Sequence, residues 1–289
     1  MIIFFESGKL GNQLFQYCAM KKFQPGGLIV AIGMSELKDN FTGIDIVGVS
    51  KLGKIFERII GRIGKNRIEY AAEKMRILTM VDEIRSPSGI RFSVKTGLLK
   101  KLAYFKAGYY QSEDMVDDGI AKYIALNQKN REIADKFFNS IPGDKANRFF
   151  VHVRRGDYAY WPNREYPAVL PFVWYREQMN RVRSKNPNAK FIVVSDDKPY
   201  VDEFFSNEKD VVVACGDMIS DFAVMTKCLG GGVLSASSLS WWASYFIRRD
   251  NVDATFVAPT FWGGHRLGSW YPEQIQTTWI NYANVECND

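Results

Sequence analysis

The sequence predicts an α/β protein built from Rossmann-type units, because strand, turn and helix follow one another in a repeated order. Residues 1–5 form an apolar run that leads into a glycine-punctuated turn at residues 7–13 and then a helix-like stretch at residues 14–22. The same order restarts at three later apolar runs, which begin near Arg148, Lys190 and Gly232. Strands that alternate with helices are typical of parallel sheets covered by helices.

Length and composition are those of a globular chain. Its 289 residues are 46% hydrophobic and 14% aromatic, which is enough to build a core without disulfides or a structural metal. The four cysteines lie far apart, so we expect reduced thiols in a cytoplasmic protein. The first apolar run stops at Glu6, too early for a signal peptide or membrane anchor. We expect the uncharged residues 228–247 to form a strand, a turn and a helix start rather than a membrane span.

A breaker run of Ile-Pro-Gly-Asp at residues 141–144 closes a polar, helical segment and marks the expected domain boundary. The sequence therefore predicts an N-terminal domain at residues 1–145 and a C-terminal domain at residues 146–289.

A basic amphipathic helix is predicted at residues 51–65, in a chain with a formal net charge of +6. One interpretation is a surface helix that docks its isoleucines on the domain. The other is an interfacial helix on anionic lipid headgroups, which would place the protein peripherally on the inner face of the cytoplasmic membrane.

An arginine pair follows the second apolar strand, in the segment His-Val-Arg-Arg-Gly-Asp at residues 152–157. Strand alternation places Arg154 at the end of the strand with its guanidinium free, and Arg155 is expected to pair with Asp157. Paired planar donors match phosphate oxygens, and two arginines beside one acid leave a positive charge. The motif therefore predicts a diphosphate site.

Polar residues also follow the other strands. Asn12 and Gln13 lie in the first turn, where ligands of α/β sheets bind, although the turn lacks the spacing of a nucleotide-binding loop. Residues 235–238 end a strand and open a helix, so their hydroxyls and free N–H groups can bind an anion, whereas Trp241 and Trp242 are expected in the core. Residues 195–197, Ser-Asp-Asp, are either a metal site or a capping turn, and the chain has no D-x-D triplet.

Five segments together resemble the bacterial, soluble α-1,2-fucosyltransferases of glycosyltransferase family 11. They are, in the family's order, Gly-Lys-Leu-Gly-Asn-Gln-Leu-Phe-Gln-Tyr at residues 8–17, Gly-Tyr-Tyr-Gln-Ser at 108–112, residues 152–157, residues 195–197 and the block at 221–242. The resemblance implies two facing Rossmann-like domains of the glycosyltransferase B type with a cleft between them, the first on the acceptor side and the second binding GDP-fucose. It also implies inverting transfer of fucose to a 2-hydroxyl, usually that of galactose, without a metal cofactor.

The resemblance assigns roles to single residues. Arg154 resembles the donor-phosphate arginine, His152 and Asp221 resemble guanine-side contacts, and Ser237 and Ser238 resemble phosphate-side hydroxyls. The expected donor-binding set is Asn12, Gln13, His152, Arg154, Arg155, Asp196, Asp221, Ser237 and Ser238. The chain departs from the family at Lys9, where a second glycine is usual, and at Ala236, where asparagine is common.

The expected chemistry places Arg154 where other enzymes use a divalent ion, because breaking the bond to fucose leaves negative charge on the diphosphate. Inversion also needs a base behind the acceptor hydroxyl. Asp157 and Glu165 are both candidates, and Glu6, before the first turn, is a third. The expected partners are GDP-fucose and a galactose-containing oligosaccharide or lipid-linked glycan, with no nucleic acid. Two alternatives stay open: a fucosyltransferase that acts on a protein hydroxyl, and a basic module that binds lipid or nucleic-acid surfaces.

Overall fold

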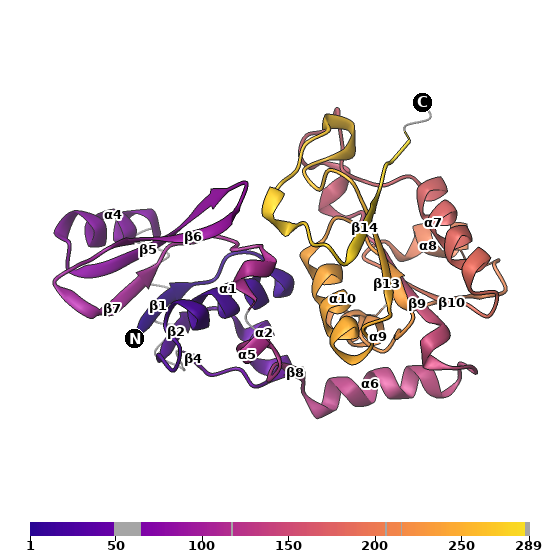
Figure 1. Cartoon of the computed structure of the whole chain (residues 1–289), viewed down its shortest axis with the longest axis horizontal. Coiled ribbons are helices and arrows are strands. Elements are labelled where there is room, and N and C mark those ends of the chain that lie inside the picture. The colour runs from indigo at the N-terminus through magenta and orange to yellow at the C-terminus, as the bar shows by residue number, and fades with distance from the viewer. Residues whose placement is uncertain (49–64, 117, 206, 215, 287–289) are drawn as a thin grey trace. The chain divides into compact units, whose positions relative to one another are not determined.

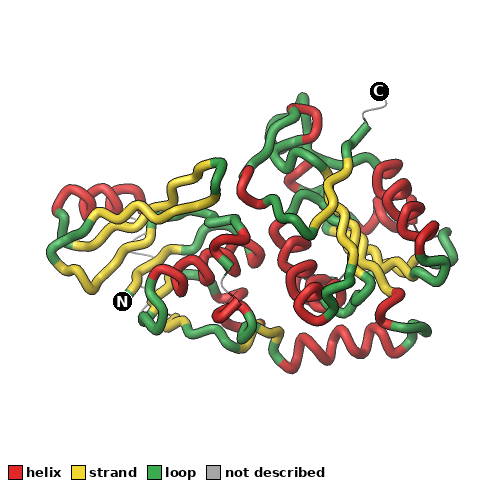
Figure 2. Tube along the Cα trace, viewed as in Figure 1, coloured by secondary structure: helices red, strands yellow, loops and turns green. Residues whose placement is uncertain are grey.

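The chain forms two compact units, Met1–Leu126 and Asn127–Asp289. A computed structural model describes residues 1–48, 65–116, 118–205, 207–214 and 216–286. Each unit has a sheet flanked by helices (Figures 1 and 2). The prediction of two Rossmann-like domains is therefore confirmed.

The first unit is built on a six-stranded sheet of order β4-β2-β1-β7-β5-β6. The pairs from β4 to β5 are parallel, and β5 and β6 form an antiparallel hairpin. Its elements are β1 (Ile2–Phe5), α1 (Leu10–Phe23), β2 (Ile29–Ile32), α2 (Ser35–Asn40), β3 (Phe41–Thr42), β4 (Ile46–Gly48), α4 (Lys65–Met75), β5 (Leu78–Ser86), β6 (Gly89–Lys95), β7 (Leu99–Phe105), η1 (Glu113–Met115), α5 (Asp118–Ala121) and β8 (Ala125–Leu126).

The second unit has a six-stranded sheet in which every pair is parallel, of order β11-β10-β9-β12-β13-β14. Numbered within the unit, this is the Rossmann order 3-2-1-4-5-6. Its elements are α6 (Gln128–Asn139), η2 (Lys145–Asn147), β9 (Arg148–Val153), η3 (Asp157–Ala159), α7 (Phe172–Lys185), β10 (Lys190–Ser195), α8 (Lys198–Phe205), β11 (Val211–Val213), α9 (Met218–Met225), β12 (Gly231–Val233), α10 (Ser238–Asp250), β13 (Thr255–Pro259), η4 (His265–Leu267), η5 (Glu273–Ile275) and β14 (Ile280–Ala283).

The central strands of the second unit are buried on both faces. All six residues of β9 are buried, and Phe149, Val151 and Val153 pack in one cluster with Trp174 and Tyr175 of α7. Continuous apolar runs of this kind are typical of parallel sheets. Gly231 opens β12 at φ +125°, where a Cβ would lie 1.9 Å from the Thr255 carbonyl oxygen, so only glycine fits between the neighbouring strands.

The boundary between the units comes before the one expected at residues 145 and 146. Helix α6 belongs to the second unit because it packs against α9, and Asp135 pairs with Lys227 at 2.7 Å. The Pro-Gly run at residues 142–143 ends this helix rather than the domain.

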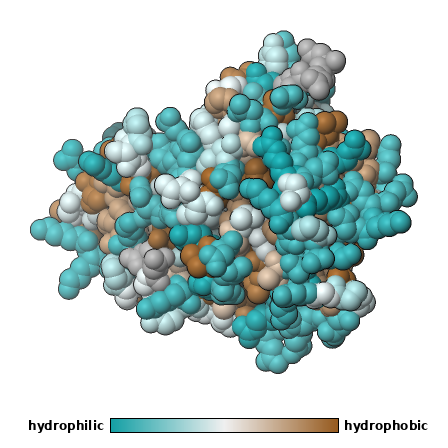
Figure 3. Space-filling model, turned by 45° about the vertical axis from the view of Figure 1, so that its right-hand side comes forward, coloured by the Kyte–Doolittle hydropathy of each residue, from teal (hydrophilic) through white to brown (hydrophobic). Residues whose placement is uncertain are grey.

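Residues 228–247 form β12, a turn and most of α10, as the sequence predicts. Within the described part of the chain, no helix is long and apolar enough to cross a membrane. On the face drawn in Figure 3, hydrophilic side chains cover most of the surface, and hydrophobic ones are scattered among them. Apart from Lys65, the predicted basic helix lies outside the described residues.

Candidate functional site

The sequence-predicted residues of the second unit follow three neighbouring strands at one edge of its sheet. Residues 154–157 follow β9, residues 195–197 end and follow β10, and residues 235–238 follow β12. The strand order reverses between β9 and β12, and ligands of open α/β sheets bind at the carboxyl ends of strands beside such a reversal. We call this the carboxyl edge.

Arg154 lies at this edge between two carboxylates. Its Nη2 donates to Asp157 Oδ1 at 2.6 Å, and its Nη1 pairs with Asp196 Oδ2 at 2.7 Å. The expectation of a free guanidinium is therefore wrong, because Asp196 from the neighbouring strand reaches it. Asp196 Oδ1 also accepts from the Arg155 N–H, and a Cβ at Gly156 would lie 2.6 Å from Asp196 Oδ2. The glycine of the motif leaves room for this carboxylate.

Arg155 pairs with Asp197, not with Asp157. Its Nε donates to Asp197 Oδ2 at 2.9 Å, and its guanidinium lies 3.7 Å from the ring centroid of Tyr200. Asp197 Oδ1 accepts from the Tyr200 N–H at 3.2 Å, in the first turn of α8. Of the two interpretations of residues 195–197, the capping turn is the one that the structure shows.

The charge of the cluster also differs from the prediction. Arg154 and Arg155 face Asp157, Asp196 and Asp197, so the described cluster has one more negative than positive charge. Residues distant in the sequence but adjacent in the sheet supply the extra acids. A diphosphate that binds these arginines therefore competes with their carboxylate partners.

Ser235, outside the predicted set, joins the ends of β9 and β12. Its Oγ donates to the His152 carbonyl at 2.6 Å, accepts from the Arg154 N–H at 2.9 Å and lies 2.8 Å from the Tyr175 hydroxyl. The side chain is buried. It is the first hydroxyl after the β12 run, and that position is the sequence signal that could have found it.

Ser237 is the N-cap of α10, whose N-terminus faces the carboxyl edge. Its Oγ accepts from the Leu239 N–H at 3.3 Å, and Ser238 is the first residue of the helix. The N-terminus of a helix carries partial positive charge that favours anions. Trp241 and Trp242 are fully buried, which confirms that they belong to the core.

His152 and Asp221 are buried titratable groups with opposite shifts. Burial, with a smaller contribution from Arg154, lowers the pKa of His152 to about 4, and its Nδ1 is buried without a hydrogen-bond partner. Burial raises the pKa of Asp221 to about 6, although the Gly216 N–H donates to its Oδ1 at 2.7 Å. Near neutral pH the imidazole is uncharged, and the carboxylate carries a charge that its surroundings disfavour.

The two candidate bases of the second unit differ in their surroundings. Asp157 contacts Arg154, yet its side chain is 64% exposed. Glu165 lies on an exposed turn in which Asn163 Oδ1 accepts from the N–H groups of Glu165 and Tyr166. Tyr158, near the start of the same loop, donates its hydroxyl hydrogen to the Ala236 carbonyl.

In the first unit, Asn12 and Gln13 lie in the first turn of α1, which begins at Leu10, and not in the turn before the helix. Gln111 donates to Asn12 Oδ1 at 2.7 Å, and Gln16 donates to the Gly108 carbonyl at 2.9 Å. These contacts join residues 8–17 to residues 108–112, two of the five segments. Gln13 is buried, donates to Glu6 and accepts from the Leu37 N–H. The structure therefore gives Gln13 internal partners and leaves Asn12 partly exposed.

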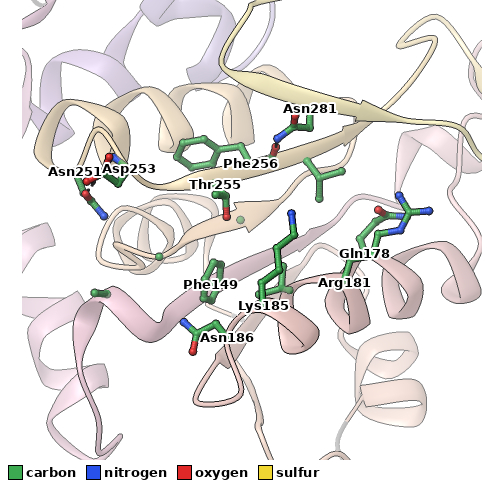
Figure 4. Close-up of a pocket in the computed structure, with 15 residues that line it drawn as sticks. Phe149, Gln178, Arg181, Lys185, Asn186, Asn251, Asp253, Thr255, Phe256 and Asn281 are labelled. Atoms are coloured by element: carbon green, nitrogen blue, oxygen red, sulfur yellow. Dashed lines mark hydrogen bonds between the residues drawn. The ribbon is translucent and has the colours of Figure 1, made fainter.

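A pocket of about 500 Å³ lies elsewhere in the second unit (Figure 4). Its lining includes Phe149 and Thr255 near the starts of β9 and β13, and Asn186 and Asn251 just after α7 and α10. These positions mark the amino ends of the strands, which we call the amino edge. The pocket contains none of the predicted site residues.

Comparisons with known proteins establish the family. Residues 81–279 match the family described as Glycosyl transferase family 11. The chain belongs to this family. It is 24% identical over 311 residues to the O-antigen biosynthesis glycosyltransferase WbnK of Escherichia coli, and the match covers 95% of this chain and 98% of that protein. The chain is thus a glycosyltransferase, as the resemblance implied.

Solved structures support the fold. Fucosyltransferase NodZ from Bradyrhizobium superposes with a TM-score of 0.51 at 10% identity, covering 84% of this chain and 92% of NodZ. POFUT1 in complex with GDP-fucose superposes with a TM-score of 0.51 at 14% identity, covering 88% of this chain and 95% of POFUT1. At these identities the likeness shows a shared two-domain fold.

Proposed function

We propose that this family 11 glycosyltransferase transfers fucose from GDP-fucose, with inversion and without a metal ion, to the 2-hydroxyl of a galactose residue in a glycan. One observation carries the donor assignment: Arg154, the N-terminus of α10 and the hydroxyls of residues 235–238 gather where the strand order reverses. The fucosyltransferase folds that this chain resembles, one of them solved with GDP-fucose, support the same donor.

The donor diphosphate takes the place of Asp157 on Arg154. Asp157 is the more exposed of the two acids, with 64% of its side chain exposed against 27% for Asp196. Asp196 stays in place because it also holds the Arg155 N–H, so Arg154 keeps its orientation when phosphate binds. A fixed guanidinium then stabilises the charge that grows on the leaving group, with no reorganisation during the reaction.

Asp221 and His152 serve the guanine base. A carboxylate can accept from both N–H groups on the guanine edge, and this contact compensates for the burial that raises the pKa of Asp221. The neutral His152 ring offers Nδ1, which has no hydrogen-bond partner among the described residues.

Glu165 is the base in this proposal. Inversion places the base on the side of the sugar opposite to the leaving diphosphate, whereas Asp157 contacts the arginine that holds the diphosphate. Glu165 lies on the same loop beyond that contact and is open to solvent.

A glycan acceptor is favoured over a protein hydroxyl. The curated relative acts in O-antigen biosynthesis and aligns over nearly its whole length. Galactose as the accepting sugar, and the 2-linkage, rest on the motif resemblance.

A donor screen tests the proposal. We expect hydrolysis or transfer with GDP-fucose and at least about tenfold less with GDP-mannose or UDP-galactose, a difference of about 1.4 kcal/mol. The rate should stay within about twofold when EDTA is added, because Arg154 neutralises the diphosphate. NMR of the product made on lactose gives the linkage and the anomeric configuration. Equal rates with all three donors would overturn the donor assignment, and loss of activity in EDTA would overturn metal independence.

A further inference from the structure

Two loops meet at the carboxyl edge of the second sheet. One follows β9 and spans residues 154–171, and the other follows β13 and spans residues 260–279. They touch at Gly264, where a Cβ would lie 3.4 Å from Pro162 Cδ. In Figure 1 the gold loop that follows β13 lies at the same end of the sheet as the chain segment that follows β14.

These loops carry tyrosine rings that face solvent. Tyr160 is 63% exposed, Tyr166 is 38% exposed and Tyr271 is 53% exposed. A Cβ at Gly263 would lie 3.0 Å from the Tyr271 Cβ, and the next residue, Gly264, is the one that contacts Pro162. Binding residues are often found on loops that a rigid scaffold positions.

The loop that carries Tyr160 is held in one shape. The rings of Tyr158 and Trp161 lie 5.4 Å apart, the Ala168 N–H donates to the Trp161 carbonyl at 2.8 Å, and Asn163 closes the turn between them. Tyr158 also ties the loop to the candidate donor site, since its ring lies 5.8 Å from the Arg154 guanidinium. A surface built this way can position a second substrate beside the donor.

An aromatic ring face suits a sugar. One face of a galactopyranose ring presents C–H groups, which interact favourably with the negative face of an aromatic ring. The Arg164 guanidinium lies over one face of the Tyr160 ring, 5.2 Å from its centroid, so a sugar would stack on the opposite face.

We propose that Tyr160 belongs to the acceptor subsite, in which a hexose ring of the glycan stacks on the Tyr160 ring. This inference rests on the proposed function and adds a residue that recognises its acceptor.

Steady-state kinetics with lactose as the probe tests the subsite. Tyr160→Ala should raise the KM for lactose about five- to tenfold, the range expected for loss of one ring contact. Hydrolysis of GDP-fucose in water should stay within about twofold, because the donor site is unchanged. Tyr160→Phe should keep the parental KM, whereas Tyr160→Leu should behave like alanine, since it is apolar but has no ring. Tyr123→Ala is the matched control, because Tyr123 is 65% exposed in the first unit.

Three outcomes would overturn the inference: a KM for Tyr160→Ala equal to that of the control, a parental KM in Tyr160→Leu, or equal loss of hydrolysis and transfer. A parent that hydrolyses GDP-fucose but never fucosylates lactose would also count against a galactoside at this surface. Failure of the proposed function itself has a different signature, because the parent would then not hydrolyse GDP-fucose at all.

Discussion

The two edges of the second sheet differ in the chemistry of their side chains: one has a pocket, and the other has the charged and polar groups of the candidate site. The amino edge has a pocket of about 500 Å³ lined by amides, Phe149 and Lys185, and Figure 4 shows the Lys185 side chain pointing into it. The carboxyl edge has clustered charges, a helix N-terminus and a hydroxyl that joins two strands. The features that suit a nucleotide diphosphate lie at the carboxyl edge, away from this pocket.

Strand direction explains the difference. In a parallel sheet, the helices that follow the strands begin at the carboxyl edge and end at the amino edge. Asn186 and Asn251, the C-caps of α7 and α10, therefore line the amino-edge pocket. Carboxyl ends of helices carry partial negative charge, which disfavours a diphosphate, whereas Ser237 opens a helix at the other edge.

The largest expected effect at the carboxyl edge is that of Glu165→Gln. Removing a general base typically lowers turnover about 10²- to 10⁴-fold. The affinity for GDP should not change, because Arg154 pairs with Asp157 and Asp196 and not with Glu165. Single-turnover rates with GDP-fucose and lactose, with calorimetric titration of GDP, measure both quantities. Asp157→Asn is the matched control, and a larger loss in that variant than in Glu165→Gln would reverse the assignment.

Arg154→Lys tests whether the donor phosphate needs the planar guanidinium of Arg154, with its two donor nitrogens. Lysine keeps the charge but cannot hold Asp196 and a phosphate through two planar nitrogens. Charge-assisted hydrogen bonds contribute about 1.5 to 3 kcal/mol each, so turnover should fall roughly 10- to 200-fold.

Arg155→Lys is the comparison for this variant. Its partners are Asp197 and the Tyr200 ring, so this variant should mainly have a lower melting temperature. Its turnover should fall less than that of Arg154→Lys. An Arg154→Lys enzyme within about threefold of parental turnover would mean that the donor phosphate binds elsewhere.

Local patterns in the sequence were sufficient for the order of elements and for the position of Arg154 at a strand end. They did not predict the partners of Arg154. Asp196 directly follows the neighbouring strand β10, and it lies beside Arg154 only because the sheet register pairs Ser195 with Val153. The contacts of Ser235 were not predicted for the same reason, since its three partners lie 60 or more residues away. The predicted domain boundary was wrong because the Pro-Gly run indicates only where helix α6 ends. The contacts of α6 with α9 are what assign this helix to the second unit.

Asp221→Asn separates a ligand-binding acid from a structural one. The folded pKa of about 6 lies above the ordinary value, so the folded chain binds more protons between about pH 4 and 6 and loses stability as the pH rises through this range. Asparagine keeps the acceptor for the Gly216 N–H and removes this loss. The variant should therefore gain about 1 to 3 kcal/mol at pH 7 and nothing at pH 4.

The affinity for GDP should fall in the same Asp221→Asn variant, because one carboxylate contact to the base is lost. Denaturant melts at both pH values and calorimetry measure the two effects. Lower stability at pH 7, or unchanged affinity for GDP, would show that Asp221 does not serve the donor.

The smallest expected effect belongs to the amino edge. Lys185→Ala removes a cation from the pocket, yet turnover and the KM for GDP-fucose should stay within about twofold, since the C-caps beside it disfavour phosphate. Gln178→Leu should leave stability unchanged or raise it by up to about 1 kcal/mol, because the Gln178 side chain is buried and its Oε1 has no hydrogen-bond partner. A loss of turnover of more than about tenfold in either variant, with the melting temperature preserved, would place the chemistry at the amino-edge pocket and reverse the comparison between the edges.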